Sequence, residues 1–397
     1  MKKILSTLLA IMIALTLISC GETGAGTEDY EDNYLYIRIN HILHRVNVET
    51  ATAVPLCPDP LCTHSDFDCP YYGIDEIGMK TAGQYIYFMR RVTSPVENPY
   101  LSVIPNQLCR MDLSDGSLEV LYEPDGAISQ LLVIHDCVYF NLETTEMTEL
   151  GGGRGYVGSR YHICRYDLKT KKVKYLTEEP LEELQYLYYE KDGRLYWNDH
   201  SDKYSTDLDY RDRREEETLA VNSVGNYRFV YDGYVKNPPN VQNCLIFGFT
   251  REDMTTGERI RIMDAVPMPV YVYGEKLIYR KLLEEPVFVG YSYILDAVTE
   301  SYDQVKNYDA FGGKLYICDL DGGNERLLCD LSEGGYVLPG WSDPLGEKLG
   351  IGNVIAIETW RYVYEEGTQD ILSNPQHIFL IDITTGEARE VQVETRS

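Results

Sequence analysis

Basic residues are scarce in this 397-residue chain: 36 Lys and Arg stand against 63 Asp and Glu, which leaves a net charge of −27. A surface that binds nucleic acid needs a basic face to neutralise phosphates, so this composition argues against nucleic acid as a partner. The same deficit argues against adhesion to anionic lipids through a polybasic surface. With 44% apolar residues, the chain is nevertheless that of a folded protein with a large core.

Recognisable catalytic motifs are also lacking. No H-E-x-x-H, G-x-S-x-G or P-loop sequence occurs, and the seven histidines are scattered. The stretch Gly153–Gly158 matches G-x-G-x-x-G, but no apolar strand precedes it and no helix follows, so we expect a hairpin loop. The acidic run from Asp199 to Asp212 lacks the order of a calcium loop and is interleaved with basic residues, which favours a solvated loop. The catalytic residues are therefore unknown from the sequence.

Only one long hydrophobic run is present, and it stands at the N-terminus. Two lysines precede it and it ends at Ile18, which is the layout of a secretory signal and shorter than the ~20 apolar residues that span a bilayer. The sequence Leu17-Ile18-Ser19-Cys20 resembles the lipobox of bacterial lipoproteins. The resemblance implies that residues 1–19 are a cleaved signal peptide and that Cys20 is lipidated. An ordinary secreted protein with a chance cysteine is the alternative.

This signal sequence predicts a protein of the bacterial cell envelope that faces outside the cytoplasm. The membrane is then contacted through the lipid anchor alone. Residues 20–33 are rich in Gly, Thr, Glu and Asp without apolar periodicity, so they are expected to form a flexible tether.

A repeat sets the expected fold. Alternating strands carry an Asp or Asn anchor, a Gly- or Thr-containing turn and a second strand, which is the pattern of a hairpin. The anchors are Asn47, Asp112, Asp167, Asp253, Asp319 and Asp382, and the widest gap has room for a degenerate copy within Asp207–Glu217. Seven units with a mean period of about 56 residues are close to the length of propeller blades with long loops.

Aromatic strands precede the anchors and helical periodicity is nearly absent. We therefore predict an all-β fold, a β-propeller of seven blades over residues 34–397, with six or eight as alternatives. The first unit lacks an obvious inner strand. The segment Pro286–Phe311 is expected to be an oversized loop with a short helix around Tyr293–Val305.

The sequence from Gly313 to Asn324, GKLYICDLDGGN, resembles the repeat of the TolB-like and low-density-lipoprotein-receptor-like propellers found in bacterial lipoproteins. The likeness is strongest in that copy and in the copies that end at Asp112, Asp167 and Asp382. It implies a propeller fold and a scaffold for binding, and it carries no catalytic residue over.

The sharpest local feature is a C-x4-C-x-H-x4-C cluster in the connector of residues 57–70. Cys57, Cys62, His64 and Cys69 offer three thiolates and an imidazole, a complete tetrahedral set for zinc or another thiophilic metal. Two alternatives are open: a disulfide between two of the cysteines, as export permits, or a plain Pro-rich connector. Six further cysteines, at 109, 137, 164, 244, 318 and 329, lie in strand patterns and are expected to be free thiols used as small apolar residues.

The function these features favour is a membrane-anchored propeller that binds a protein or glycan at one face of the ring. A propeller-fold glycan lyase or hydrolase is one alternative, since any two of the 63 acidic residues might meet in space. Metal capture or sensing through the Cys57, Cys62, His64 and Cys69 cluster is the other. The lack of a catalytic motif favours binding over enzymatic activity.

Overall fold

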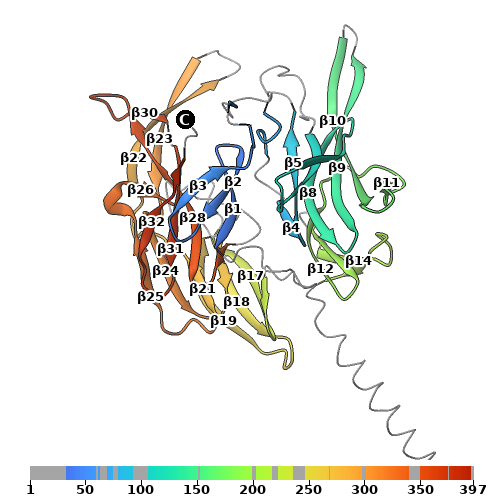
Figure 1. Cartoon of the computed structure of the whole chain (residues 1–397). Helices are drawn as coiled ribbons and strands as arrows, with labels where there is room; N and C mark the ends of the chain where they lie inside the picture. Colours follow the sequence, from blue (N-terminus) through green and yellow to red (C-terminus); the bar gives the residue numbers. More distant parts are fainter. Residues whose placement is uncertain are drawn as a thin grey trace, which may run out of the picture.

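The computed structural model describes residues 33–59, 61–62, 69–74, 79–92, 106–150, 153–198, 203–216, 222–235, 246–267, 269–296, 301–338, 349–373 and 375–394. Seven sheets, antiparallel except for one strand of the first, are arranged as the blades of a β-propeller (Figure 1). Apart from one 3-10 turn at Ser332–Gly334, the described elements are all strands. The predicted all-β, seven-bladed fold is confirmed.

Blade 1 contains β1 (Tyr34–Ile39), β2 (Ile42–Asn47), β3 (Thr52–Pro55) and β33 (Gln392–Val393). Blade 2 contains β4 (Lys80–Ala82), β5 (Tyr85–Arg91), β6 (Asn106–Asp112) and β7 (Leu118–Tyr122). Blade 3 contains β8 (Ala127–Ile134), β9 (Cys137–Leu150), β10 (Gly153–Asp167) and β11 (Lys172–Tyr175). Blade 4 contains β12 (Tyr186–Lys191), β13 (Arg194–Asn198), β14 (Lys203–Asp207) and β15 (Arg214–Glu215).

Blade 5 contains β16 (Asn222–Val224), β17 (Tyr227–Val235), β18 (Ile246–Asp253) and β19 (Arg259–Pro267). Blade 6 contains β20 (Tyr271–Tyr273), β21 (Lys276–Tyr279), β24 (Lys314–Asp319) and β25 (Arg326–Asp330), with the hairpin β22 (Val287–Asp296) and β23 (Ser301–Asp309) inserted. Blade 7 contains β26 (Tyr336–Val337), β27 (Gly350–Ile351), β28 (Val354–Arg361), β31 (Gln376–Asp382) and β32 (Ala388–Glu390), with the hairpin β29 (Val363–Tyr364) and β30 (Ile371–Ser373) inserted.

The anchor residues shape the turn between the last two strands of a blade. Asp167 Oδ1 accepts hydrogen bonds from the N–H groups of Lys169 at 3.0 Å and Thr170 at 2.7 Å. Asn47, Asp253 and Asp382 each accept the N–H groups two and three residues further on in the same way. These bonds satisfy turn amides that no strand can pair. The predicted hairpin role of these anchors is confirmed.

The anchors of blades 4 and 6 form other contacts. Asp207 Oδ1 accepts the N–H groups of Asp209 and Arg211, at 3.1 and 2.7 Å, so the degenerate copy predicted within Asp207–Glu217 is the turn of blade 4. Asp319 differs, because its carboxylate pairs with Lys276 and accepts from the Asn324 side chain at 2.6 Å.

The long insertions gather on one face of the ring. In an antiparallel blade, the connections from first to second strand and from third to fourth leave by one face, and all other connections leave by the opposite face. We call the first of these two faces, which holds the anchor turns, the turn face. The opposite one is the hairpin face. The hairpin face carries the long β9–β10 hairpin and the inserted pairs β22–β23 and β29–β30, which point upward in Figure 1.

The insertion in blade 6 corrects one expectation. β22 and β23 pair antiparallel, with Tyr293 opposite Gln304, so the helix predicted around Tyr293–Val305 is wrong. Val287-Phe288-Val289 and the alternating residues after Gly290 are strand formers, and they pair locally as a hairpin.

Ring closure uses the last described strand. β33 runs parallel to β3, with Gln392 N–H bonded to Ala51 O and Glu394 N–H bonded to Ala53 O, both at 2.9 Å. β1 occupies the place that the second strand holds in the other blades, since the anchor turn follows the next strand. Within the described residues, blade 1 therefore lacks a first strand, as the sequence indicated.

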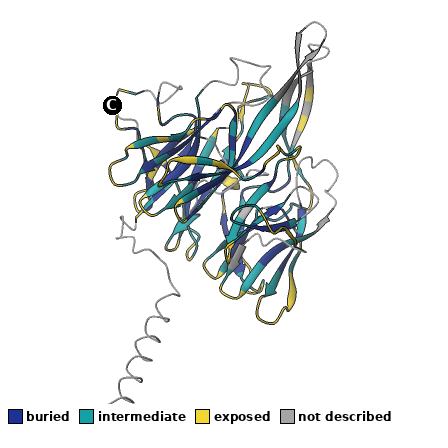
Figure 2. Ribbon diagram, turned by 90° about the vertical axis from the view of Figure 1, so that its right-hand side faces the viewer, coloured by how far each residue is buried: buried dark blue, intermediate teal, exposed yellow. Residues whose placement is uncertain are grey.

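Apolar side chains from adjacent blades form the core. Six large clusters of buried residues each join neighbouring blades, for example Leu35 and Ile37 of blade 1 with Leu380 of blade 7. Figure 2 shows these buried residues in the strands and the exposed ones in turns and at blade edges. Among the described residues, no such cluster joins blades 4 and 5, where the Lys191 amine lies 3.5 Å from the Met254 sulfur.

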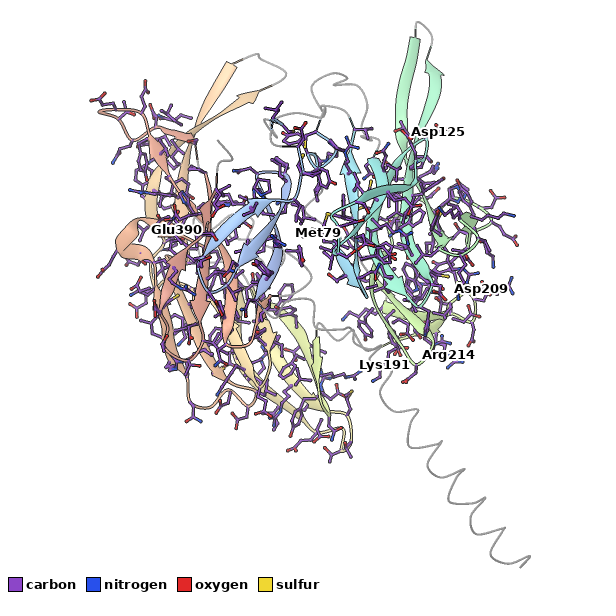
Figure 3. All side chains as sticks on the ribbon, in the orientation of Figure 1. Met79, Asp125, Lys191, Asp209, Arg214 and Glu390 are labelled. Atoms are coloured by element: carbon purple, nitrogen blue, oxygen red, sulfur yellow. The ribbon has the colours of Figure 1, made fainter. Side chains whose placement is uncertain are left out.

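Polar contacts dock the anchor turns on the preceding blade. Arg326 of β25 donates to Ile383 O of the blade 7 turn at 2.6 Å. Arg389 of β32 donates to Val48 O of the blade 1 turn at 2.7 Å. Lys174 of β11 pairs at 2.7 Å with Asp209, which lies at the outer edge of blade 4 (Figure 3). These three seams thus combine apolar packing with a contact to the turn of the next blade.

Candidate functional site

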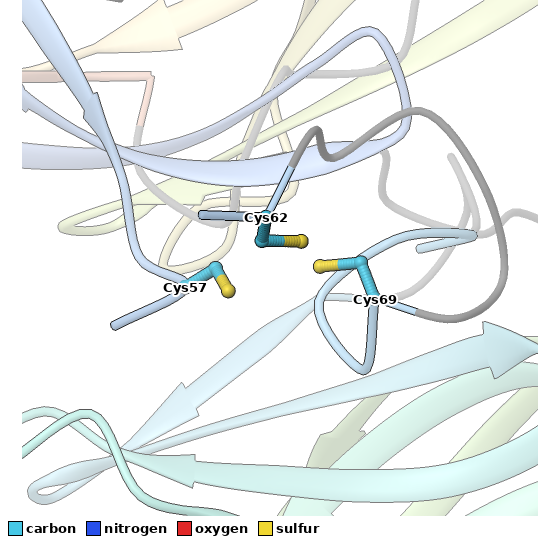
Figure 4. A group of neighbouring side chains, drawn as sticks. All are labelled: Cys57, Cys62 and Cys69. Atoms are coloured by element: carbon cyan, nitrogen blue, oxygen red, sulfur yellow. The ribbon is translucent and has the colours of Figure 1, made fainter. Parts of the chain in front are cut away.

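The three cysteines of the connector converge at the seam between blades 1 and 2. Their sulfur atoms lie within 4.8 Å of one another, and Figure 4 shows the sulfurs of Cys62 and Cys69 directed toward each other. Cys57 and Cys69 are 2% exposed, and Cys62 is half-buried. The connector therefore presents a compact group of thiols, of which two are inside the protein.

Local turns bring the cysteines together. Leu56 N–H bonds to Leu43 O at 3.0 Å, which fixes the chain against blade 1 just before Cys57. Asp59 then reverses the chain, because its side chain accepts the Leu61 N–H at 2.9 Å and its carbonyl accepts the Cys62 N–H at 3.3 Å. A second turn follows Cys69, whose carbonyl accepts the Tyr72 N–H at 3.0 Å.

Burial favours the protonated form of the Cys57 and Cys69 thiols when no cation is near. Desolvation is the largest effect on both buried groups: it raises the pKa of the Cys57 thiol, and it raises the pKa of Cys69 to about 12. A metal ion would supply the positive charge that a buried thiolate needs.

The donor set fits a thiophilic metal. In a tetrahedral site with Zn–S bonds of ~2.3 Å the sulfurs lie ~3.8 Å apart, so these three sulfurs, which lie within 4.8 Å of one another, would have to move slightly closer to share one ion. Three soft sulfur donors suit zinc, copper(I) or iron better than calcium or magnesium. Cys57, Cys62 and Cys69 could thus hold a metal ion. His64, the fourth predicted ligand, lies outside the described residues.

The other cysteines follow the expectation where the structure describes them. Cys109, Cys164, Cys318 and Cys329 are buried free thiols, and Cys137 is a half-buried free thiol. Cys244 and Cys20 lie outside the described residues, as do the predicted signal peptide and most of the tether. Within the part of the chain that is described, no helix has the length and hydrophobicity needed to span a membrane.

The connector continues past the cysteines as a bridge between blades. Tyr71, 5% exposed, donates a hydrogen bond to Gly116 O in the blade 2 anchor turn at 2.6 Å. Ile74 N–H bonds to His41 O of blade 1 at 3.1 Å, and Gly73 O accepts the Arg91 N–H of blade 2 at 2.8 Å. The sequence does not predict this contact of Tyr71. The only sign of it is the position of Tyr71 two residues after the last cysteine.

A cavity of about 240 Å³ adjoins the cluster. It is lined by Leu56 and Pro58 on either side of Cys57, by Arg45 of blade 1 and by the blade 2 turn from Asp112 to Gly116. Its wall combines a guanidinium, carboxylates and apolar surface at the same seam.

Two other motifs prove to be structural. Gly153–Gly158 lies in β10, paired with β9, so the predicted hairpin is confirmed, but the segment is a strand of that hairpin and the predicted loop is wrong. Asp207 holds a turn, Asp209 pairs with Lys174 and Arg165, and Asp212 pairs with Arg194 and Arg214. Asp199 and Asp202 lie outside the described residues.

No family model matches the sequence, and no curated protein matches it either. Several solved structures are similar in fold. An oligogalacturonate lyase from Vibrio parahaemolyticus is 10% identical, with a TM-score of 0.41, over 91% of this chain and 90% of that one. An oligogalacturonate lyase in complex with manganese is 11% identical, with a TM-score of 0.40, over 85% of this chain and 82% of that one.

The propeller domain of the Trilobed protease from Pyrococcus furiosus, which has an open velcro topology, is 11% identical. Its TM-score is 0.33 over 80% of this chain and 97% of that one. All three are likenesses of fold alone. At these identities and TM-scores they transfer neither an activity nor a ligand to this chain.

Proposed function

We propose that the protein is a lipid-anchored propeller of the bacterial cell envelope that binds a protein or glycan through its hairpin face. The observation that carries this proposal is the placement of β9–β10, β22–β23 and β29–β30 on one face, opposite the short anchor turns. Loops that extend from a rigid scaffold are where binding residues concentrate. Cys20, in its lipobox-like sequence, would hold the ring at the membrane by its lipid.

Shortening of one hairpin tests the binding face. Thr145 lies opposite Ser159, so residues 146–158 can be replaced by Asn-Gly at a register position that a tight turn closes. The probes are mucin O-glycans, polygalacturonate and purified cell-wall sacculi, presented to the full chain. Binding of any probe should be lost in the shortened variant and kept by Met254→Ser on the turn face. A loss of binding in Met254→Ser alone would place the ligand on the turn face and contradict the proposal.

Fractionation of cells tests the anchor. Cys20→Ala should yield a soluble form or an unprocessed precursor, whereas Cys137→Ala, a matched change in blade 3, should remain in the membrane fraction. A Cys20→Ala chain that is processed normally and stays membrane-bound would refute the lipid anchor.

A second role is favoured by the convergence of Cys57, Cys62 and Cys69. We infer that they hold zinc or another thiophilic metal, with His64 as the predicted fourth ligand, and that the metal fixes the connector at the seam. Tyr71 and Gly73, which follow the cluster, bond to blade 2. Loss of metal should therefore loosen blades 1 and 2 without unfolding the remaining blades.

A further inference from the structure

The inserted hairpins of blades 6 and 7 are joined into one unit. Tyr364 donates its hydroxyl to Val289 O at 2.6 Å, and the Tyr291 N–H bonds to Gln369 O at 2.9 Å. A Cβ at Gly290 would lie 2.6 Å from Gln369 O, so glycine permits the close approach. We call residues 284–291 together with 363–373 the paired hairpins; β22 and β30 lie side by side in Figure 1.

Large apolar side chains are exposed on the paired hairpins. Val287 is 55% exposed, Val363 42%, Tyr364 43% and Leu372 65%. They are four of the eleven large apolar side chains that are exposed among the described residues. Single exposed apolar residues are ordinary, but several on one pre-organised element mark an interaction site.

The charges within residues 284–291 and 363–373 are all acidic, and the β22–β23 hairpin has one Lys, Lys306 of β23, which lies opposite Tyr291. Glu284, Glu285, Glu365, Glu366 and Asp370 lie in these two segments, which contain no Lys or Arg. The four glutamates form no ion pair within the described part of the chain, although many carboxylates elsewhere do. Exposed apolar side chains beside a surplus of carboxylates repel anionic lipid and nucleic acid and attract a cationic partner.

We propose that the paired hairpins bind a cationic amphipathic segment of a second protein. Its apolar side chains contact Val363, Tyr364 and Leu372, and its Lys or Arg residues pair with the four glutamates. This proposal deepens the proposed function, because it rests on the hairpin face as the binding face and names the class of partner. The bonds between the hairpins hold the surface in place before the partner arrives, which lowers the entropic cost of binding.

The test uses a fluorescent peptide of alternating Leu and Lys pairs and the full chain in phosphatidylcholine nanodiscs, with binding to empty discs subtracted. Leu372→Ser and Val363→Ser should each weaken binding about tenfold. Val120→Ser and Leu327→Ser, at exposed apolar sites on other blades, should bind as the parent does. Glu365→Gln with Glu366→Gln should flatten the dependence of affinity on salt.

Two results would overturn the proposal: unchanged binding by Leu372→Ser and Val363→Ser, or equal affinity for a Lys-Ser peptide that lacks leucine. The outcome is independent of the hairpin-shortening experiment, which changes blade 3 only. If glycan or sacculus binding depends on β9–β10 while Leu372→Ser has no effect on the peptide, the proposed function stands and the cationic partner is rejected.

Discussion

The Tyr71 hydroxyl donates a hydrogen bond to Gly116 O at 2.6 Å, and this bond joins the cysteine connector to the anchor turn of blade 2. In the seams that blade 7 makes with blades 6 and 1, an arginine of the fourth strand reaches the next turn, as Arg389 reaches Val48 O. Blade 1 relies instead on a side chain of the segment that follows Cys69. The cysteine cluster and the contact that docks blade 2 therefore lie on one short stretch of chain.

Tyr71→Phe should lower the free energy of unfolding by about 1 kcal/mol, because a half-buried carbonyl loses its partner while the ring still packs. The loss should be local, with faster amide hydrogen exchange at residues 112–118. The measurement is exchange followed by mass spectrometry on the parent and the variant.

Tyr273→Phe is the matched control. Tyr273 donates to Gly352 O at 2.9 Å across the seam between blades 6 and 7, so its loss should speed exchange near residues 350–354 and leave 112–118 unchanged. Equal protection of 112–118 in Tyr71→Phe and the parent would mean that the hydrogen bond does not hold the blade 2 turn.

Asp167→Ala should lower the melting temperature at neutral pH. Asp167→Asn should lower it much less. Asn47 holds the equivalent turn in blade 1 with a neutral amide oxygen. The hydrogen bond from the Thr170 N–H holds the pKa of the Asp167 carboxyl below its usual value of 3.8. A lowered folded pKa stabilises the protein above about pH 4, and that stabilisation disappears as pH falls through the folded value.

Thermal melts between pH 7 and pH 2.5 check this prediction. The gap between the parent and Asp167→Asn should close as the carboxyl becomes protonated. A gap that stays constant over this range would show that the charge of Asp167 contributes nothing to stability.

Gly257→Ala and Gly386→Ala compare two positions at the same place in the anchor turn. Both glycines have positive φ, 73° and 80°, which costs an L-residue ~1–2 kcal/mol. A Cβ at Gly257 meets nothing within 4 Å, whereas one at Gly386 would lie 2.1 Å from Leu328 O of blade 6. Gly386→Ala should therefore cost a further ~1–3 kcal/mol in chemical denaturation, and equal losses would contradict close docking of the turn.

The blade pattern could be predicted because each anchor works locally. An Asp or Asn that bonds to amides two and three residues on leaves a signature within a few positions, and even Asp207 was found by its place in the repeat. Ring closure could not be predicted, since β33 has two residues and pairs with β3 across the whole sequence. The helix predicted around Tyr293–Val305 is wrong. This segment is an insertion outside the repeat, so no repeated pattern indicated that it forms two strands.

The convergence of the three cysteines could be predicted for the same local reason. Cys57, Cys62 and Cys69 are close in sequence, and two short turns suffice to bring their sulfurs together. Contacts made by Tyr71 with Gly116, or by Tyr364 with Val289, join residues 45 and 75 positions apart. Such contacts follow from the packing of blades and leave no spacing rule in the sequence.

Metal content is the most direct test of the cysteine cluster. The full chain, purified under reducing conditions without chelator, should contain about one equivalent of zinc or another thiophilic metal by elemental analysis. Cys62→Ser should abolish that content, and Cys137→Ser, which changes a free thiol outside the cluster, should preserve it. A chain without metal, whose segment 57–69 has a mass lower by two hydrogens under native conditions, would contain a disulfide and contradict the metal site.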